Sequence, residues 1–225
     1  MNENLTQKIR NDFDRIALHD QERWDHNNHY HKFVLQQLPK HCQTVLDIGC
    51  GTGEFSRIVA KTSERVVSID LSPNMIEVAK QRSQQYTNID FQVADILQWD
   101  IPVEKFDAIV SIATVHHLPL ENLLPNLKTA LKPGGRLVIL DLLEYENIQD
   151  SLSDIVAVPL NLLLQMLRNR HIKSTPEAAA TMLEHLRTDK YLTLSQAEQI
   201  YTKFLGKAKV RKHLFWRYSV VWQKD

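Results

Sequence analysis

The chain has 225 residues and equal numbers of basic and acidic side chains, 27 each, so its formal net charge is zero. The hydrophobic share of 43% and the charged share of 24% are ordinary for a folded domain. These values exclude a low-complexity or collagen-like chain and a protein-wide basic field for nucleic acid. Glycine is scarce, with six residues where about 16 would be usual, and half of them fall between positions 49 and 53.

From residue 44 to residue 141, short β-rich runs alternate with helical stretches. Near-continuous apolar strands separated by helices are typical of a parallel sheet that is buried on both faces. The predicted strands are 44–48, 66–70, 89–93, 106–112 and 136–141, and the predicted helices are 54–63, 72–84 and 120–131. A Pro-Gly-Gly turn is expected at 133–135, before the fifth strand.

The remainder of the chain has a different pattern. Residues 145–205 are helix-rich and hold no strand candidate, with a break expected near 174–176. Four leucines in this segment are spaced for one helix face and suit either the core or a lid over a pocket: Leu160, Leu163, Leu164 and Leu167. Alternating apolar residues over 214–222 predict a final strand, preceded by another over 208–213 with no clear turn signal between them.

Two further features bear on location and partners. The two cysteines, Cys42 and Cys50, form no disulfide framework, and the N-terminus lacks an apolar signal core. The apolar run at 155–167 is shorter than the ~20 residues of a membrane span. We therefore expect a cytoplasmic protein without a membrane span.

Residues 201–225 carry seven basic side chains and one acidic side chain, which favours a lysine-protected sheet edge over a polyanion contact. The oligomeric state stays open.

The glycine loop, DIGCGTG at 47–53, joins the first strand to the first helix. Such a loop brings a ligand against the N–H groups at a helix N-terminus. Its spacing is G-x-G-x-G, and Glu54 stands where a dinucleotide site has its third glycine. Asp47 would repel a pyrophosphate and suits a cofactor with an ammonium and a sulfonium. Asp70 ends the second strand, where a carboxylate can accept both ribose hydroxyls.

The runs VLDIGCGTGEFS, IDLSP, VADILQWD, FDAIVSIATVHHL and LKPGGRLVILD occur in this order. Together they closely resemble the class I S-adenosylmethionine-dependent methyltransferases over residues 43–141. The end segments FDRIA, WDHNNHYHKFVLQQLP and RKHLFWRYSVVW are similar to the small-molecule, type 11 or ubiquinone-biosynthesis-like subgroup. We therefore predict an α/β fold: a doubly wound, Rossmann-like seven-stranded sheet, mostly parallel with an antiparallel C-terminal strand, plus a helical cap. Residues 1–144 would hold the N-terminal helices and cofactor core, 145–205 the cap that forms the acceptor pocket, and 206–225 the strands that complete the same sheet.

The resemblance implies a set of cofactor contacts. The methionine moiety would lie over the glycine loop and near the end of the fourth strand, and the ribose and adenine near the ends of the second and third strands. The implied residues are Asp47, Gly49, Cys50, Gly51 and Gly53 in the loop; Asp70, Leu71 and Met75 after the second strand; Ala94, Asp95 and Ile96 after the third; and Ser111, Ile112 and Ala113 at the fourth. Taken alone, Asp95 also suits a helix cap and Asp70 a strand-end turn.

Candidate catalytic residues occur in two places: directly after the fourth strand, and in the N-terminal segment that contains Tyr30. His116 or His117 could bind the acceptor or take its proton; the alternative is a helix cap and a solvated imidazole. A metal is not expected, because adjacent histidines seldom ligate one ion and no acid completes the set. His26, His29 and His31 suggest zinc by spacing, but no Cys or patterned carboxylate supports it. We favour a helix that covers the cofactor, with Tyr30 as an active-site wall; a purely structural helix is the alternative.

The predicted function is methyl transfer from S-adenosyl-L-methionine, which yields S-adenosyl-L-homocysteine, to a small-molecule acceptor. The place after the fourth strand reads SIATVH rather than the Asn/Asp-Pro-Pro-aromatic motif of amine-modifying nucleic-acid enzymes. No Cys follows Cys50 to serve as a cytosine-C5 nucleophile, and two thiols are too few for an arsenite-type enzyme. The alternatives are an RNA methyltransferase that uses the basic C-terminal segment and a non-catalytic S-adenosylmethionine-binding protein. A nicotinamide dehydrogenase ranks last.

Overall fold

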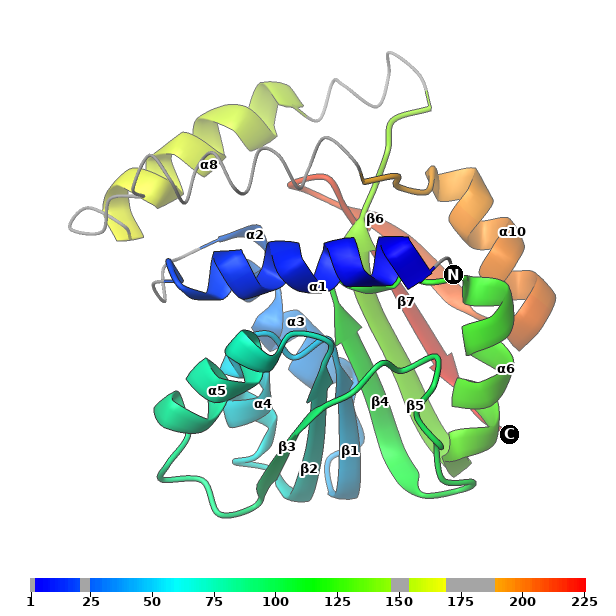
Figure 1. Ribbon diagram of the computed structural model, residues 1–225. Helices are drawn as coiled ribbons and strands as arrows, with labels where there is room; N and C mark the ends of the chain where they lie inside the picture. The colour runs from blue at the N-terminus through cyan, green and yellow to red at the C-terminus, as the bar shows by residue number, and fades with distance from the viewer. Residues whose placement is uncertain (1–2, 21–24, 147–153, 169–188) are drawn as a thin grey trace.

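The computed structural model describes residues 3–20, 25–146, 154–168 and 189–225. One sheet lies between helices in Figure 1. In chain order the elements are α1 (Glu3–Ala17), α2 (His26–His29), α3 (His31–Gln37), β1 (Cys42–Ile48), α4 (Glu54–Val59), β2 (Ser63–Asp70), α5 (Pro73–Arg82), β3 (Ile89–Val93), β4 (Phe106–Ile112), the 3-10 helix η1 (Val115–His117), α6 (Leu120–Ala130), β5 (Leu131–Leu142), α8 (Asp154–Arg168), α10 (Leu194–Leu205), β6 (Lys209–His213) and β7 (Arg217–Gln223).

The sheet has seven strands in the order β3-β2-β1-β4-β5-β7-β6. The first five strands pair in parallel, β7 runs antiparallel to β5, and β6 runs antiparallel to β7. The strand order reverses between β1 and β4, and open α/β sheets bind ligands at this switch point. The predicted doubly wound fold with its antiparallel C-terminal strand is confirmed.

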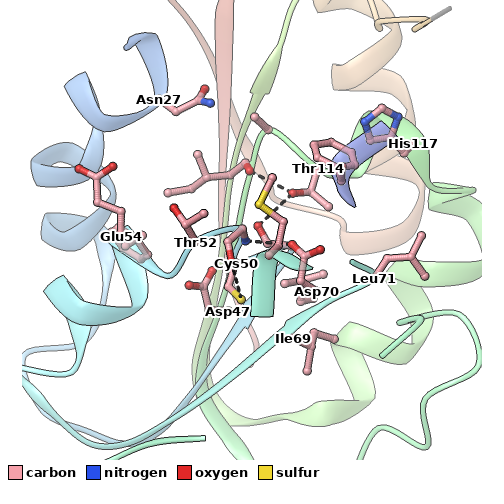
Figure 2. A pocket seen from close by; sticks show the side chains of 18 of the residues that line it. Asn27, Asp47, Cys50, Thr52, Glu54, Ile69, Asp70, Leu71, Thr114 and His117 are labelled. Atoms are coloured by element: carbon pink, nitrogen blue, oxygen red, sulfur yellow. Dashed lines mark hydrogen bonds between the residues drawn. The ribbon is translucent and has the colours of Figure 1, made fainter. Parts of the chain in front are cut away.

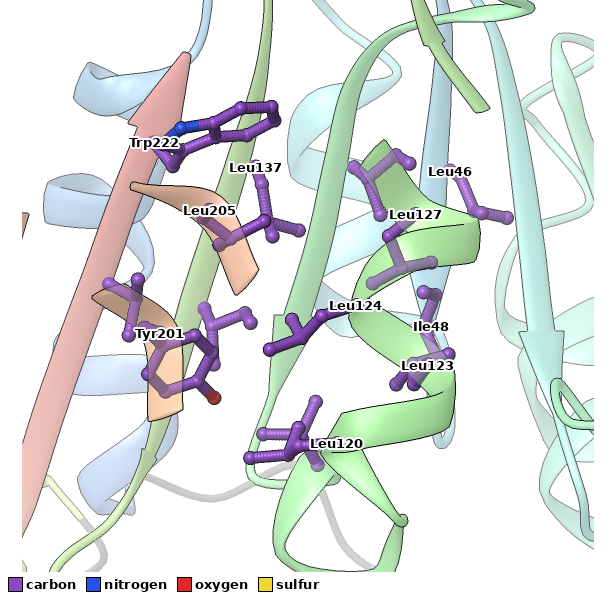
Figure 3. Packing of buried hydrophobic residues seen from close by; sticks show 14 of the residues in the cluster. Leu46, Ile48, Leu120, Leu123, Leu124, Leu127, Leu137, Tyr201, Leu205 and Trp222 are labelled. Carbon is purple, nitrogen blue, oxygen red and sulfur yellow. The ribbon is translucent and has the colours of Figure 1, made fainter. Parts of the chain in front are cut away.

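The larger core lies under α6 and α10. Apolar residues recur along α6 at helical spacing, so one face of the helix is buried against the sheet (Figure 3). Each fully buried leucine is worth about 1.5–3 kcal/mol. The residues labelled in Figure 3 are Leu120, Leu123, Leu124 and Leu127 of α6, Leu46 and Ile48 of β1, Leu137 of β5, Tyr201 and Leu205 of α10, and Trp222 of β7.

The opposite face of the sheet is covered by α3, α4 and part of α8. On α8, Leu160 and Leu164 pack against this second core, while Leu163 and Leu167 are 52% and 58% exposed. Two of the four predicted leucines therefore contact the core and two face outward. The face of α8 that packs against the core contains Ala157, Leu160 and Leu164. The break expected near 174–176 and much of the predicted cap lie outside the described residues.

Several predicted boundaries were wrong. The helix predicted over 54–63 ends at Val59, because Ser63 already pairs with Cys42 at the start of β2. The turn expected at 133–135 lies within β5 as an irregularity: the pairing with β4 shifts between Phe106 and Ala108. The backbone there bonds to the end of β7 instead, through Gly134 and Lys224.

The last strand begins at Arg217 rather than at 214. Phe215 and Trp216 form the turn before it, with φ of 58° and 56°, a left-handed conformation that costs about 1–2 kcal/mol per residue without glycine. Phe215 is completely buried and stacks on His26 of α2, with ring centroids 5.1 Å apart. This packing offsets the backbone strain. Aromatic residues therefore form a turn here, at positions where their alternating pattern had predicted a strand.

The edge strand β6 carries Lys209, Arg211 and Lys212. Charged side chains on an edge discourage the addition of a further strand, in line with the favoured interpretation of the basic segment. In the described part of the chain, no helix has the length and apolar character needed to cross a membrane.

Candidate active site

A cavity of about 390 Å³ opens at the carboxyl ends of β1, β2 and β4, within the range of small-molecule sites. In Figure 2, Asn27 and Glu54 lie on one side of it and His117 on the other, with Asp47 and Asp70 between them. The parallel strands bring these side chains together because their carboxyl ends meet at one edge of the sheet.

The glycine loop forms the cavity floor. Gly49, Gly51 and Gly53 have φ of 70°, 51° and 77°, a left-handed conformation that only glycine adopts without strain. A Cβ on Gly49 would collide with the side chain of Thr114, and one on Gly53 would lie 2.9 Å from the Phe91 ring. The loop thus follows its path because glycine removes both the strain and the collisions.

Asp47 is the penultimate residue of β1, next to this loop, and is 2% exposed. Its Oδ2 accepts a hydrogen bond of 2.6 Å from Ser56 Oγ on α4. Burial raises the pKa of Asp47 to about 6, the Ser56 hydrogen bond opposes that rise, and the nearby Asp70 adds to it. The carboxylate therefore holds its charge at neutral pH in an unfavourable place, which a cationic ligand would relieve.

Asp70 ends β2 on the adjacent side of the cavity. Its two carboxylate oxygens accept backbone N–H bonds, Oδ2 from Gly51 and Oδ1 from Ser72, each at 2.9 Å. Burial raises the pKa of Asp70, and these backbone hydrogen bonds partly offset the rise. Burial likewise raises the pKa of the Cys50 thiol well above its usual value, so this sulfur faces the cavity as a neutral group.

Most of the predicted cofactor residues line the cavity. Those on its wall are Asp47, Gly49, Cys50, Gly51, Asp70, Leu71, Met75, Ala94, Asp95, Ile96, Ile112 and Ala113. Gly53 and Ser111 do not line the cavity. Gly53 precedes α4, and Ser111 Oγ donates to the Ile48 carbonyl at 3.0 Å. Asp95 also caps a turn, because its Oδ1 accepts from the N–H of Leu97 at 3.0 Å, as the alternative interpretation supposed.

Of the three predicted catalytic residues, one lines the cavity and two do not. His117 lines the cavity, and its ring lies edge-on to Phe13 of α1. His116 is not on the cavity wall, and its Nδ1 lies 2.7 Å from Oδ1 of the buried Asp141. Tyr30 is also away from the wall, because its hydroxyl donates to the Leu214 carbonyl at 2.9 Å. Burial raises the pKa of Tyr30 to about 12.

Sequence reasoning missed the contribution of α1, which places Ile9, Phe13 and Ile16 on the cavity wall. Their spacing along one helix face was the available signal. The helix is fixed to the start of α5 by Asp14, whose carboxylate accepts from Ser72 Oγ at 2.5 Å. The other lining residues, none of which was predicted to be a cofactor or catalytic residue, are Asp20, Asp25, Asn27, Asn28, His31, Ile48, Thr52, Glu54, Phe55, Ile69, Thr114 and Leu118.

The N-terminal histidines do not converge on a metal site. His26 stacks on Phe215, His29 lies edge-on to Tyr30, and the His31 ring contacts Phe55. Among the described residues, the three-ligand cluster of suitable geometry contains none of them. None of the described residues in 145–205 lines the cavity either.

The fold and the cavity define a Rossmann-like α/β protein with an acidic, glycine-rich ligand site at the switch point of its sheet. Residues 45–135 match the model of a methyltransferase domain family. This part of the chain is a methyltransferase domain, and the predicted membership of the class I S-adenosylmethionine-dependent methyltransferases is confirmed for it.

Related proteins agree with this assignment. The chain is 35% identical over 108 residues to a ubiquinone biosynthesis O-methyltransferase of Coxiella burnetii, covering 47% of this chain and 46% of that protein. It is 31% identical over 147 residues to a demethylmenaquinone methyltransferase of Tropheryma whipplei, covering 60% and 59%. The chain thus spans about half the length of the curated relatives it matches.

Solved structures support the fold. The N-methyltransferase NodS of Bradyrhizobium japonicum, solved with S-adenosyl-L-homocysteine, superposes with a TM-score of 0.63 at 18% identity and covers 99% of both chains. At this identity the similarity concerns the fold.

Proposed function

We propose that this protein transfers the methyl group of S-adenosyl-L-methionine to a small-molecule acceptor. The observation that carries the proposal is the pair of buried carboxylates, Asp47 and Asp70, on either side of the left-handed glycine loop. The carboxylate of Asp47 beside the loop would repel the pyrophosphate of a dinucleotide, whereas a cofactor with an ammonium, a sulfonium and a ribose diol complements both carboxylates.

Each part of the cofactor has a complementary group. Asp47 would attract the cationic methionine end, and Asp70, already fixed by Gly51 and Ser72, would accept from the ribose hydroxyls. Leu71, Met75 and Ile96 would enclose the adenine, because they supply apolar wall beyond Asp70. With the cofactor bound in this way, its sulfonium would lie over the loop near Ile112 and Ala113.

The chemistry is a direct displacement. A lone pair of the acceptor attacks the methyl carbon, the carbon–sulfur bond breaks, and its electron pair stays on sulfur to give S-adenosyl-L-homocysteine. Catalysis then depends largely on alignment of the two reactants. His117 is the one of the three predicted catalytic residues on the cavity wall, so we assign it the contact with the acceptor and the removal of its proton where it has one.

A small molecule suits the acceptor because the two relatives with the highest identity reported above are named for quinone-related methylation. The free thiols of Cys42 and Cys50 accord with a reducing, cytoplasmic site of action.

The test is calorimetry of the purified chain with S-adenosyl-L-methionine and with S-adenosyl-L-homocysteine. We expect micromolar binding of both ligands, and loss of both in Gly51→Val, whose branched side chain would enter the cavity. Gly206→Val is the matched control, since Gly206 also has a left-handed φ, 76°, and lies outside the cavity. Absence of binding by the folded wild-type chain would refute the proposal.

A further inference from the structure

Four buried polar side chains meet beside the cavity, at the ends of β4 and β5. His116 and His117 belong to η1, Asp141 to β5, and Asp189 lies before α10. Their side chains are 5%, 8%, 0% and 6% exposed, respectively. Groups of this polarity are seldom buried without hydrogen-bond, ionic or ligand partners.

The tautomer of His116 follows from its neighbour. Its Nδ1 lies 2.7 Å from Oδ1 of Asp141, and that oxygen also accepts from the N–H of Leu142 at 2.9 Å. An ionised carboxylate only accepts, so Nδ1 carries a hydrogen, and in the neutral imidazole Nε2 then presents its lone pair. A carboxylate behind a histidine is the arrangement that orients the metal-ligating histidines of many proteins.

The lone pair of His116 Nε2 faces a second carboxylate. Oδ2 of Asp189 lies 3.8 Å from it, and Oδ1 of Asp189 lies 3.7 Å from Nδ1 of His117. One ligand atom from each of these three residues lies within 4.8 Å of the others. The hydroxyl of Tyr191 donates a hydrogen bond to Asp189 Oδ2 at 3.1 Å and so restrains the orientation of this carboxylate.

These separations suit an ion better than direct hydrogen bonds. A direct N–H···O bond would bring nitrogen and oxygen to about 2.7–3.2 Å. A tetrahedral ion with bonds of about 2.0–2.1 Å places its ligand atoms about 3.3–3.4 Å apart. To hold an ion, each of the two nitrogen–oxygen separations would contract by about 0.3–0.5 Å. The two histidine nitrogens, which lie within 4.8 Å of each other, would approach by up to about 1.4 Å.

We propose that His116, His117 and Asp189 bind a divalent transition-metal ion of the zinc type, with Asp141 and Tyr191 as the groups that orient the ligands. Two imidazoles and one carboxylate are a donor set for zinc and iron rather than for magnesium or calcium. Three protein ligands leave a position for water or for an acceptor oxygen. Because His117 also lines the cavity, the ion would lie where it could bind and acidify an acceptor hydroxyl. In the metal-bound form the ion, and not His117, would therefore activate the acceptor, because the Nδ1 lone pair of His117 is used as a ligand.

The sequence argument against a metal rested on two points: adjacent histidines seldom ligate one ion, and no acid completed the set. Asp189 supplies the acid from a distant part of the chain, where no local pattern connects it with the histidine pair. Metal binding goes beyond the proposed methyl transfer and is measured without S-adenosylmethionine, so the two proposals fail independently.

The test uses the full chain, dialysed free of metal and then titrated with Zn²⁺ by calorimetry and with Co²⁺ by visible absorption. We expect one equivalent of either ion and Co²⁺ bands typical of a tetrahedral or five-coordinate site. Asp189→Asn and His117→Gln should each lower the Zn²⁺ affinity by at least ~100-fold, and Asp141→Asn by about 10–100-fold through the orientation of His116. His41→Gln, which removes an exposed imidazole outside the cluster, should leave affinity and stoichiometry unchanged.

Circular dichroism and thermal unfolding of each variant separate loss of the ligand from loss of the fold. Should Asp141→Asn fail to fold, Asp189→Asn and His117→Gln still decide the matter, because they replace two of the three proposed ligands directly. The proposal is overturned if the wild-type chain takes up no stoichiometric Zn²⁺, or if folded Asp189→Asn and His117→Gln bind it as tightly as His41→Gln does.

Discussion

The N–H of Gly51 donates a hydrogen bond to Oδ2 of Asp70 across 2.9 Å. This contact joins the loop after β1 to the end of β2 and holds the carboxylate in place before any ligand arrives. A preorganised acceptor loses less rotational freedom on binding, so its hydrogen bonds to a ribose contribute more to affinity.

Asp70→Asn tests this role. The amide keeps the size of the side chain and one acceptor oxygen, but it loses the charge and half of the acceptor capacity. Hydrogen bonds to charged groups are worth about 1.5–3 kcal/mol, so we expect affinity for S-adenosyl-L-homocysteine to fall about 10–100-fold. Asp90→Asn is the matched control, because Asp90 pairs with Arg65 at an exposed site. Equal affinities of the two variants in calorimetry would contradict the assignment.

The glycine loop permits a comparison of strain with steric collision. Gly49 and Gly51 both have positive φ, yet an added Cβ meets Thr114 at Gly49 and nothing within 4 Å at Gly51. Gly51→Ala should therefore lower the free energy of unfolding by about 1–2 kcal/mol through strain alone. Gly49→Ala should lower it by about 3 kcal/mol or more, because overpacking is added. Urea denaturation measures both, and an equal loss in the two variants would show that the collision is relieved at no cost.

Much of the fold could be predicted because its signals are local. Strand–helix alternation and the glycine loop located β1 to β5 and indicated that they form a doubly wound sheet. Tertiary packing decided the features that were missed: the turn at Phe215 and Trp216 is formed by aromatic residues with positive φ, which no turn rule favours. Its stability comes from α2, whose His26 stacks on Phe215, and a local pattern contains no information on that contact.

The candidate site shows the same division. Residues at strand ends, such as Asp47 and Asp70, could be predicted, because parallel strands bring their carboxyl ends to one edge. The role of Tyr30 could not, because its hydroxyl is used by the Leu214 carbonyl on a hairpin far along the chain. Asp189 was missed for the same reason: only the folded chain brings it to the histidine pair.

His31 should make stability fall in acid. Burial lowers its pKa to about 4, below the unfolded value of about 6.5. The unfolded state therefore binds the proton more tightly, and the free energy of unfolding decreases as pH falls from 6.5 to 4, by at most about 3 kcal/mol. In His31→Gln this part of the pH dependence should vanish.

The measurement is urea denaturation of wild type and variant at several pH values between 4 and 7. His41→Gln removes an exposed imidazole and should leave the wild-type slope in place. A slope unchanged in His31→Gln would mean that the acid sensitivity has another origin.

Asp47 should oppose stability and support binding, and Asp47→Asn separates the two effects. Burial raises its pKa to about 6, above the unfolded value of about 3.9, so the folded state binds the proton more tightly. Its contribution to stability is thus favourable in acid and is lost as pH rises from about 4 to 6, by about 3 kcal/mol. The neutral amide has no such loss and can still accept from Ser56. Relative to wild type, Asp47→Asn should be more stable at pH 8 than at pH 4 by up to about 3 kcal/mol, while its affinity for S-adenosyl-L-methionine falls. If denaturation shows the same stability difference between variant and wild type at both pH values, the folded state does not disfavour the ionised form of Asp47. The attraction that we assign to this carboxylate for a cationic cofactor would then lose its physical basis.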